Sequence, residues 1–235
     1  MSLTPSFPPL MQGIHAAGAD PFKAARAEAA KGCDAGTIVY DITPEALRAA
    51  IVFAPEVTLD KASAMLPLTG VAVQNALGAL GPAEVPVHLQ WDGSIRLNGG
   101  LCGGLYGAVP SRDRAAMPDW LVTGFTLVFA RPDTQGGETP DETDLYSEGC
   151  GDVSPTQFLE SWSRHLLNWI NRWEEDGMAP LHREYAGLVH GMGEDATVLG
   201  RSGHFLGLDE DLGLLLRVDG QTTVIPVTDL LETPT

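Results

Sequence analysis

The chain has 235 residues, of which 44% are hydrophobic and 19% are charged, so it can bury one large core or one large and one small core. This composition excludes intrinsic disorder. Fourteen basic residues against 31 acidic residues give a formal net charge of -17 at pH 7. Because such a field repels polyanions, nucleic acids and acidic membrane surfaces are excluded as partners.

The cysteine and histidine patterns predict neither a disulfide framework nor a metal site. Cys33, Cys102 and Cys150 are far apart and form no C-x-x-C pair, which indicates reduced thiols and a cytoplasmic protein. The six histidines lack H-x-x-x-H and H-E-x-x-H spacing. Residues 1–10 do not resemble a signal peptide, and no window approaches the roughly 18 uninterrupted apolar residues of a membrane span.

Helix and strand patterns alternate through the first three quarters of the chain. Asp20-Pro21 is typical of a helix start, and Gly32 ends that alanine-rich helix. Asp92-Gly93 suits a two-residue hairpin turn, because both positions accept positive φ. The further predicted elements are strands over 37–41 and 47–54, a helix over 66–80, and strands over 85–91, 94–98, 101–109 and 121–129.

The segment from Arg131 to Asp152 is acidic and rich in glycine, and its acids lack the spacing of a calcium loop, so we expect a solvated loop. A helix is predicted over 154–176. Ser154-Pro155-Thr156-Gln157 resembles a capping box with proline at the first helical position, and Gly177 suits the end of the helix. The tryptophans of this helix recur at helical spacing, which favours a place in the core.

After Leu181 the pattern changes to four short predicted strands separated by glycine and aspartate turns, over 196–200, 204–208, 212–218 and 222–227. This rhythm predicts a small β-barrel of SH3-like size that leans on the larger domain. We therefore expect two domains, residues 1–182 and 183–235.

Three stretches together resemble the biotin/lipoate protein ligase superfamily. Residues 66–80, Val87-His88-Leu89-Gln90-Trp91 and residues 98–105 are similar to the family's helix, its K-W-P-N-D strand and its K-x-x-G-I-L run. Residues 121–129 resemble the G-I-G-I-N strand, and the segment from Phe158 to the end resembles the last part of biotin protein ligases. The resemblance implies an α/β (α+β) fold like that of class II synthetases, a mixed sheet with flanking helices, followed by the SH3-like barrel.

The family joins a carboxylate to ATP as an acyl-adenylate and passes the acyl group to a carrier lysine. That chemistry needs cations or N–H donors around the phosphates, which the family supplies from a G-R-G-R-x-G loop and from lysines in the two K-containing motifs. Here five residues without a base separate Asp41 from Leu47, where the loop is expected. Gln90 and Leu101 stand in place of the lysines, and Gly18-Ala19-Asp20 stands in place of Ser-Thr-Asn. The fold is kept while the cationic contacts are lost.

Other residues are candidates for contacting a ligand, and each of them also has a purely structural explanation. Arginines at strand ends can bind a phosphate or carboxylate, or can simply solubilise the surface. Paired glycines admit either a ligand or a close-packed strand. A tryptophan in a strand more often belongs to the core. Cys102 is more often a buried apolar residue than a nucleophile. The ligand-binding candidates are Arg48, Gln90, Trp91, Arg96, Gly103 and Gly104, and Arg112 and Arg114 are further cations of this kind.

Three functions stay open at this point. The first is an ATP-dependent ligase that takes ATP and biotin, or a related carboxylate, and acts on a biotin-carrier-type protein. The second is a non-catalytic binding member of the same fold, and the third is an ATP-independent acyltransferase on another small carboxylate. Members of the superfamily often pair through sheet edges, so the resemblance also implies a homodimer.

Overall fold

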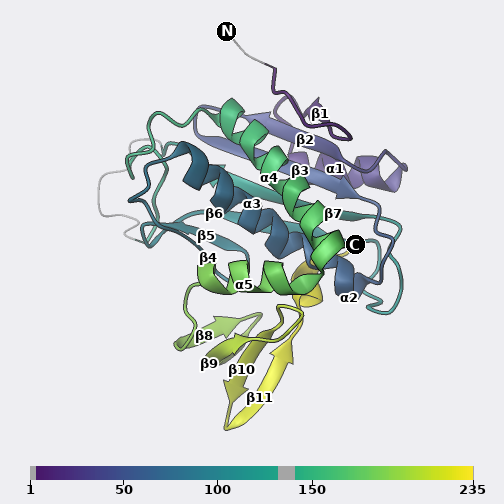
Figure 1. Ribbon diagram of the computed structural model, residues 1–235, viewed down its shortest axis with the longest axis vertical. Coiled ribbons are helices and arrows are strands. Elements are labelled where there is room, and N and C mark those ends of the chain that lie inside the picture. The colour runs from purple at the N-terminus through teal and green to yellow at the C-terminus, as the bar shows by residue number, and fades with distance from the viewer. Residues whose placement is uncertain (1–3, 132–140, 235) are drawn as a thin grey trace.

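The computed structural model describes residues 4–131 and 141–234. A large mixed sheet forms its centre (Figure 1). β1 runs parallel to β2, β12 runs parallel to β6, and the other neighbours are antiparallel. In spatial order the strands are β1 (Gln12–His15), β2 (Thr37–Ile42), β3 (Ala46–Phe53), β7 (Leu121–Val128), β6 (Gly100–Ala108), β5 (Ser94–Leu97) and β4 (Val87–Leu89), and β12 (Leu231–Glu232) lies beside β6. The predicted mixed sheet with flanking helices is confirmed.

Helices cover both faces of this sheet unequally. α3 (Met65–Leu80) and α4 (Pro155–Asp176) lie together across one face, and α1 (Pro21–Ala30) lies on the other (Figure 1). The side chain of Asp20 accepts a hydrogen bond from the Lys23 N–H at 3.0 Å, as expected of an N-cap residue. The predicted capping box at Ser154 is wrong, because the Ser154 side chain makes no capping hydrogen bond, although α4 still begins at Pro155.

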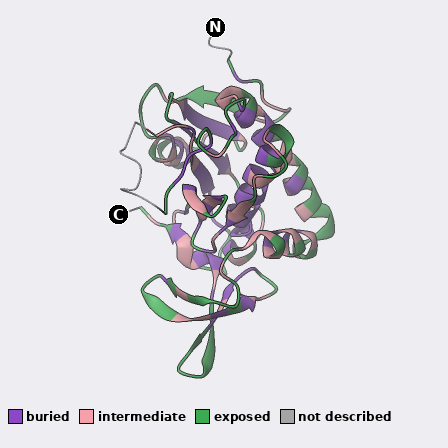
Figure 2. Ribbon diagram, turned by 90° about the vertical axis from the view of Figure 1, so that its left-hand side faces the viewer, coloured by how far each residue is buried: buried purple, intermediate pink, exposed green. Residues whose placement is uncertain are grey.

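The main core lies between the sheet and the α3–α4 pair, where buried residues gather (Figure 2). Trp162 is fully buried, and its ring meets Phe125 of β7 with centroids 4.9 Å apart. The core position predicted for the α4 tryptophans is therefore confirmed for Trp162 and Trp169. Leu59–Leu80 is long and apolar enough to cross a membrane by length and composition alone, and 72% of its apolar window is buried inside the fold. That burial is typical of a core helix.

A second sheet follows at the C-terminal end of the chain. It is an antiparallel meander in the order β11 (Gln221–Ile225), β10 (Leu214–Val218), β9 (Arg201–Leu208) and β8 (Asp195–Val198). Its inner side chains, such as Phe205 and Leu216, join the main core, as expected for a unit too small to stand alone. The predicted separate β unit is confirmed, and its closure into an SH3-like barrel stays a prediction.

Three short elements had no clear signal in the sequence: β1, α2 (Leu59–Ala62) and α5 (Met178–Leu188). The predicted domain boundary after residue 182 falls inside α5. The 3-10 helix η1 (Val227–Leu230) then leads the chain back to β12 on the large sheet. The predicted solvated loop is wrong in part, because Asp144, Leu145 and Cys150 are buried, while residues 132–140 lie outside the described residues.

Candidate functional site

A row of polar residues and one glycine crosses the large sheet on the face that carries α1. Its members, opposite one another in register from β2 to the end of β4, are Asp41, Arg48, Thr126, Gly104, Ser94 and Gln90. Directly opposed residues point to the same face of a sheet, and side chains two positions apart share that face. Val39 and Ala50, each two positions from a member of the row, pack against Ala25 and Ala29 of α1. The polar row therefore lies beside α1, away from the main core.

Strand alternation explains why the row forms. Ile38 and Tyr40 of β2, and Leu47 and Ala49 of β3, enter the main core, so Asp41 and Arg48 must point to the other face. Arg48 and Ser94 are three strand spacings apart, about 14 Å. A small organic ligand can therefore lie across the strands between them.

Asp41 anchors one end of the polar row. Its carboxylate is buried and accepts a hydrogen bond from the Gly18 N–H at 3.1 Å, and the His15 Nε2 lies 3.6 Å away. The loop that stands where the family has Ser-Thr-Asn thus uses its backbone to satisfy Asp41 rather than to offer side-chain donors. Arg48, directly opposite, is exposed, and no ion pair of its side chain is found among the described residues.

The middle of the polar row is bordered by two aromatic rings. Phe22 of α1 and Tyr106 of β6 lie with ring centroids 5.8 Å apart, and Tyr106 is 41% exposed. A Cβ atom on Gly104 would lie 3.4 Å from the Tyr106 hydroxyl oxygen, so a side chain there would crowd the space under the ring. The pair places apolar surface beside Gly104, in the middle of the polar row. Sequence reasoning missed both rings, because an isolated aromatic residue carries no signal of the surface it borders.

The two candidate glycines differ in what they do. A Cβ atom on Gly103 would lie 2.1 Å from the Thr126 carbonyl oxygen, so glycine is needed there for β6 to approach β7. Gly104 is a member of the polar row, and a Cβ atom there would meet Tyr106 and the Gly93 carbonyl only at ordinary contact distances of 3.4–3.9 Å. Gly103 is therefore explained by the close packing of β6 against β7. For Gly104, contact with a ligand stays a prediction.

Trp91 lies apart from the polar row. It is buried, and its Nε1–H donates to the Leu212 carbonyl at 2.8 Å, which joins the large sheet to the second sheet. Gln90, the residue before it, is half-buried at the end of the polar row.

Arg96 occupies the next row, opposite His88 of β4. The Arg96 Nη1 donates to the Gly99 carbonyl at 2.7 Å, while its Nε and the Nδ1 of His88 are buried without a partner among the described residues. Arg48 and Arg96 therefore do not converge on one point. One donor of Arg96 is already used in a hydrogen bond within its own hairpin.

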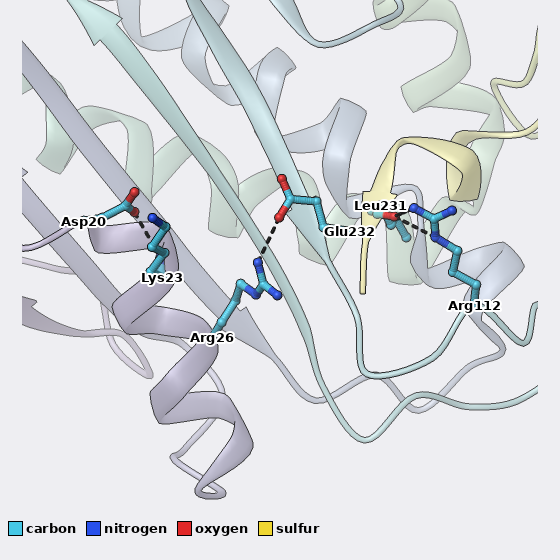
Figure 3. A network of polar contacts seen from close by, with 6 residues as sticks. All are labelled: Asp20, Lys23, Arg26, Arg112, Leu231 and Glu232. Atoms are coloured by element: carbon cyan, nitrogen blue, oxygen red, sulfur yellow. Dashed lines mark hydrogen bonds and ion pairs between the residues drawn. The ribbon is translucent and has the colours of Figure 1, made fainter. Parts of the chain in front are cut away.

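The other two candidate arginines hold the fold together. Arg112 donates from Nε and Nη2 to the Leu231 carbonyl, at 2.9 and 2.5 Å, and fixes the entry of the chain into β12 (Figure 3). Glu232 in turn pairs with Arg26 of α1 at 2.8 Å. Arg114 pairs with Asp60 at 2.5 Å, and this contact raises the pKa of the arginine. Neither Arg112 nor Arg114 reaches the polar row through these contacts.

Cys102 and Cys150 offer no nucleophile to this face. Cys102 is fully buried with its Sγ 3.4 Å from the Val128 carbonyl oxygen, and burial raises its pKa to about 12. Burial also raises the pKa of Cys150. A thiolate is the reactive form of cysteine, so both groups are unreactive near neutral pH.

Two backbone features replace the cationic parts expected from the family. Only Thr43, Pro44 and Glu45 connect β2 to β3, and the Thr43 N–H donates to the Ala46 carbonyl at 2.9 Å while the Ala46 N–H donates to the Thr43 Oγ1 at 3.1 Å. At Leu101, the position of an expected lysine, the backbone pairs with residues 141–143. A closed turn and an acidic segment therefore stand where phosphate-binding groups are expected.

A mixed sheet with helices packed as described, an open polar row and a small trailing β unit defines a protein of the biotin/lipoate ligase fold class. Residues 7–187 match the model of the biotin/lipoate A/B protein ligase family, and residues 192–233 match a domain of unknown function, DUF4444. The chain belongs to the biotin/lipoate A/B protein ligase family.

Individual relatives agree with this assignment. A biotin–[acetyl-CoA-carboxylase] ligase of Paracoccus denitrificans is 26% identical over 173 residues, which are 69% of this chain and 70% of the relative. A biotin protein ligase-like protein of unknown function from Silicibacter sp. TM1040 is 55% identical, with a TM-score of 0.92 over 98% of this chain and 100% of the other. The Aquifex aeolicus biotin protein ligase, solved with biotin and ATP, is 18% identical with a TM-score of 0.70 over 92% and 95% of the two chains, which is a likeness of fold.

Proposed function

We propose that this chain is a non-catalytic member of its family that binds a small carboxylate, biotin or a related acid, on the polar row without ATP. Arg48 pairs with the ligand carboxylate, and Phe22 with Tyr106 contacts its apolar part. The observation that carries the proposal is the closed turn between β2 and β3, next to a single exposed arginine. One guanidinium matches one carboxylate, whereas a triphosphate requires several donors.

The negative charges of the chain support ligand binding without ATP. The buried Asp41 lies opposite Arg48, the segment beside Leu101 carries Asp141 and Glu142, and the whole chain has a net charge of -17. Arg131, the cation nearest to that segment, is already paired with Glu142. A polyphosphate would therefore meet repulsion with little local compensation.

Cys102 and Cys150 give no support to the ATP-independent acyltransferase. Acyl transfer through a thioester needs a thiolate, and Cys102 and Cys150 are both buried with raised pKa values. Ser94 and Thr126 are the hydroxyl groups of the polar row, and no base within hydrogen-bond distance of either hydroxyl is found among the described residues. Binding therefore fits the polar row better than group transfer.

Calorimetric titration with biotin, with and without ATP, tests the proposal. We expect saturable binding of biotin that ATP leaves unchanged, and a biotinyl-adenylate mimic that binds no more tightly than biotin. Arg48→Gln should weaken biotin binding by about tenfold or more, because a charge-assisted hydrogen bond is lost. The matched control is Arg164→Gln, which removes an exposed arginine of α4 on the opposite side of the sheet and should leave binding unchanged.

ATP-dependent attachment of biotin to a carrier protein would contradict the proposal and restore the ligase. Absence of binding by biotin, lipoate and short-chain acids alike would also overturn it. A biotin-carrier-type protein as partner is compatible with the proposal, and co-purification of such a protein with the wild type but not with Arg48→Gln would place it at the same face.

A further inference from the structure

The second sheet carries a hollow of its own on the face turned away from the core. The hollow has a volume of about 470 Å³, within the range of roughly 300–1,000 Å³ that is typical of small-molecule sites. It is open to solvent and is lined mainly by β8, β9 and the end of β10. This hollow is separate from the polar row, which lies on the large sheet.

A second line of polar side chains crosses the floor of this hollow. Asp195 of β8 lies opposite His204 of β9, and His204 lies opposite Arg217 of β10. Phe205 and Leu216, the neighbours of His204 and Arg217 in sequence, enter the core, so these two polar side chains point outward. The sheet register thus brings a carboxylate, an imidazole and a guanidinium side by side.

The hydrogen bond between Asp195 and His204 fixes which side of the imidazole is available. The His204 Nδ1 lies 3.1 Å from the Asp195 Oδ1, so the carboxylate orients the ring and leaves Nε2 free for another partner. No ion pair or hydrogen bond of the Arg217 side chain is found within residues 4–131 and 141–234. Arg217 therefore has a full set of donors to offer to a ligand.

Acidic side chains at the rim of the hollow carry the charge opposite to that of Arg217. Asp219 lies two positions beyond Arg217 and also lines the hollow, and the Asp195 side chain is 93% exposed. Thr197 and Ser202 contribute hydroxyl groups whose oxygens lie 2.8 Å apart. Cationic and anionic side chains therefore border the same hollow.

We propose that this hollow binds a small zwitterion, an α-amino acid, whose carboxylate pairs with Arg217 and whose ammonium group pairs with Asp219 and Asp195 and can donate to the free Nε2 of His204. A simple anion suits the site less well, because it would face Asp195 and Asp219 without a partner for them. A simple cation would face Arg217 without a partner for it. A zwitterion satisfies both sets of charges with no net electrostatic cost of approach.

Nuclear magnetic resonance titration of the full-length chain tests this assignment, with L-alanine, acetate and methylammonium as three separate probes. We expect L-alanine to shift the amide signals of residues 195–204 and 217–219 saturably. Acetate and methylammonium, which each carry half of the charges, should need about tenfold higher concentration or more. Arg217→Gln should weaken the binding of L-alanine by about tenfold.

Arg201→Gln is the matched control, because Arg201 is an exposed arginine of the same sheet that does not line the hollow. It should bind L-alanine as the wild type does. Arg217 is exposed, so its replacement leaves the core intact, and unchanged signals of Phe205 and Leu216 will verify the fold of the variant. The assignment is overturned if L-alanine gives no saturable shifts at these residues, if acetate binds as tightly as L-alanine, or if both arginine variants behave alike.

Discussion

Asp41 and Arg48 lie directly opposite each other on β2 and β3, yet only the carboxylate is buried. Asp41 takes its hydrogen bond from the Gly18 backbone, and no ion pair with Arg48 is formed. The cation of this pair is thus left to solvent and to any ligand. The proposed carboxylate site depends on this combination: Asp41 is buried and satisfied by the backbone, and Arg48 is exposed and available to a ligand.

The first prediction concerns Asp41 as a structural anchor. Asp41→Ala removes the acceptor of the Gly18 N–H, and we expect the free energy of unfolding in urea to fall by about 1–2 kcal/mol, as for the loss of a hydrogen bond to a charged group. Asp34→Ala, at an exposed turn residue, is the control. Equal stability of the two variants would contradict the anchoring role.

The two neighbouring glycines give a second prediction. Gly103→Ala places a Cβ atom 2.1 Å from the Thr126 carbonyl oxygen, so β6 must move, and we expect a loss of about 1–3 kcal/mol in the free energy of unfolding. Gly104→Ala meets Tyr106 and the Gly93 carbonyl at ordinary contact distances of 3.4–3.9 Å and should fold normally while it weakens biotin binding. The reverse pattern, a stable Gly103→Ala and an unfolded Gly104→Ala, would refute the assignment of the two roles.

A third prediction separates Trp91 from the ligand site. Trp91→Phe keeps an aromatic ring but removes the hydrogen bond to the Leu212 carbonyl. We expect the free energy of unfolding to fall by about 1 kcal/mol and the affinity for biotin to stay as in the wild type. Calorimetry of the folded variant checks the second part, and a lower affinity would return Trp91 to the list of ligand contacts.

Thiol reactivity provides a fourth prediction, with a defined direction in pH. Because burial raises the pKa of Cys102 to about 12, its thiolate fraction at pH 8 is far smaller than that of an ordinary cysteine. Alkylation of the native protein should therefore modify Cys33, which is half-buried, well before Cys102 or Cys150.

The raised pKa of Cys102 also makes the stability of the fold depend on pH. The folded protein keeps the Cys102 proton that the unfolded chain releases above its ordinary pKa of 9.0, so this contribution is fully present below pH 9 and is lost as the pH rises toward 12. The alkaline fall in stability should be less steep in Cys102→Ala than in the control Cys33→Ala. Equal slopes would show that Cys102 does not titrate in this way.

Oligomeric state is the subject of a fifth prediction. All four residues of β1, at one edge of the large sheet, are exposed, and the family resemblance implies pairing through sheet edges. Light scattering is expected to report twice the mass of one chain. Replacing Ile14, an exposed apolar residue of β1, by lysine should then give the mass of a monomer, because a charged edge resists pairing. A wild type that is already monomeric would reject the prediction.

The sequence by itself determined most strands, the helix over 154–176 and the trailing β unit, because apolar periodicity, proline at helix starts and glycine-aspartate turns are local signals. The mixed sheet was implied by the family resemblance. It also predicted the loss of the phosphate loop, since a missing segment is visible without coordinates. It proposed Arg48 and Gly104 as ligand contacts with the same weight as Arg96, Trp91 and Gly103.

Only the tertiary structure decided which of these residues belong together. Strand register, which depends on pairing between segments far apart in the chain, placed Asp41, Arg48, Thr126 and Gly104 in one line and assigned Trp91 to the junction with the second sheet. The same register brought His204 beside Arg217 in the second sheet. Long-range pairing carries no local sequence signal, because it is fixed by how the whole core packs, and for that reason the polar row became visible only in the folded chain.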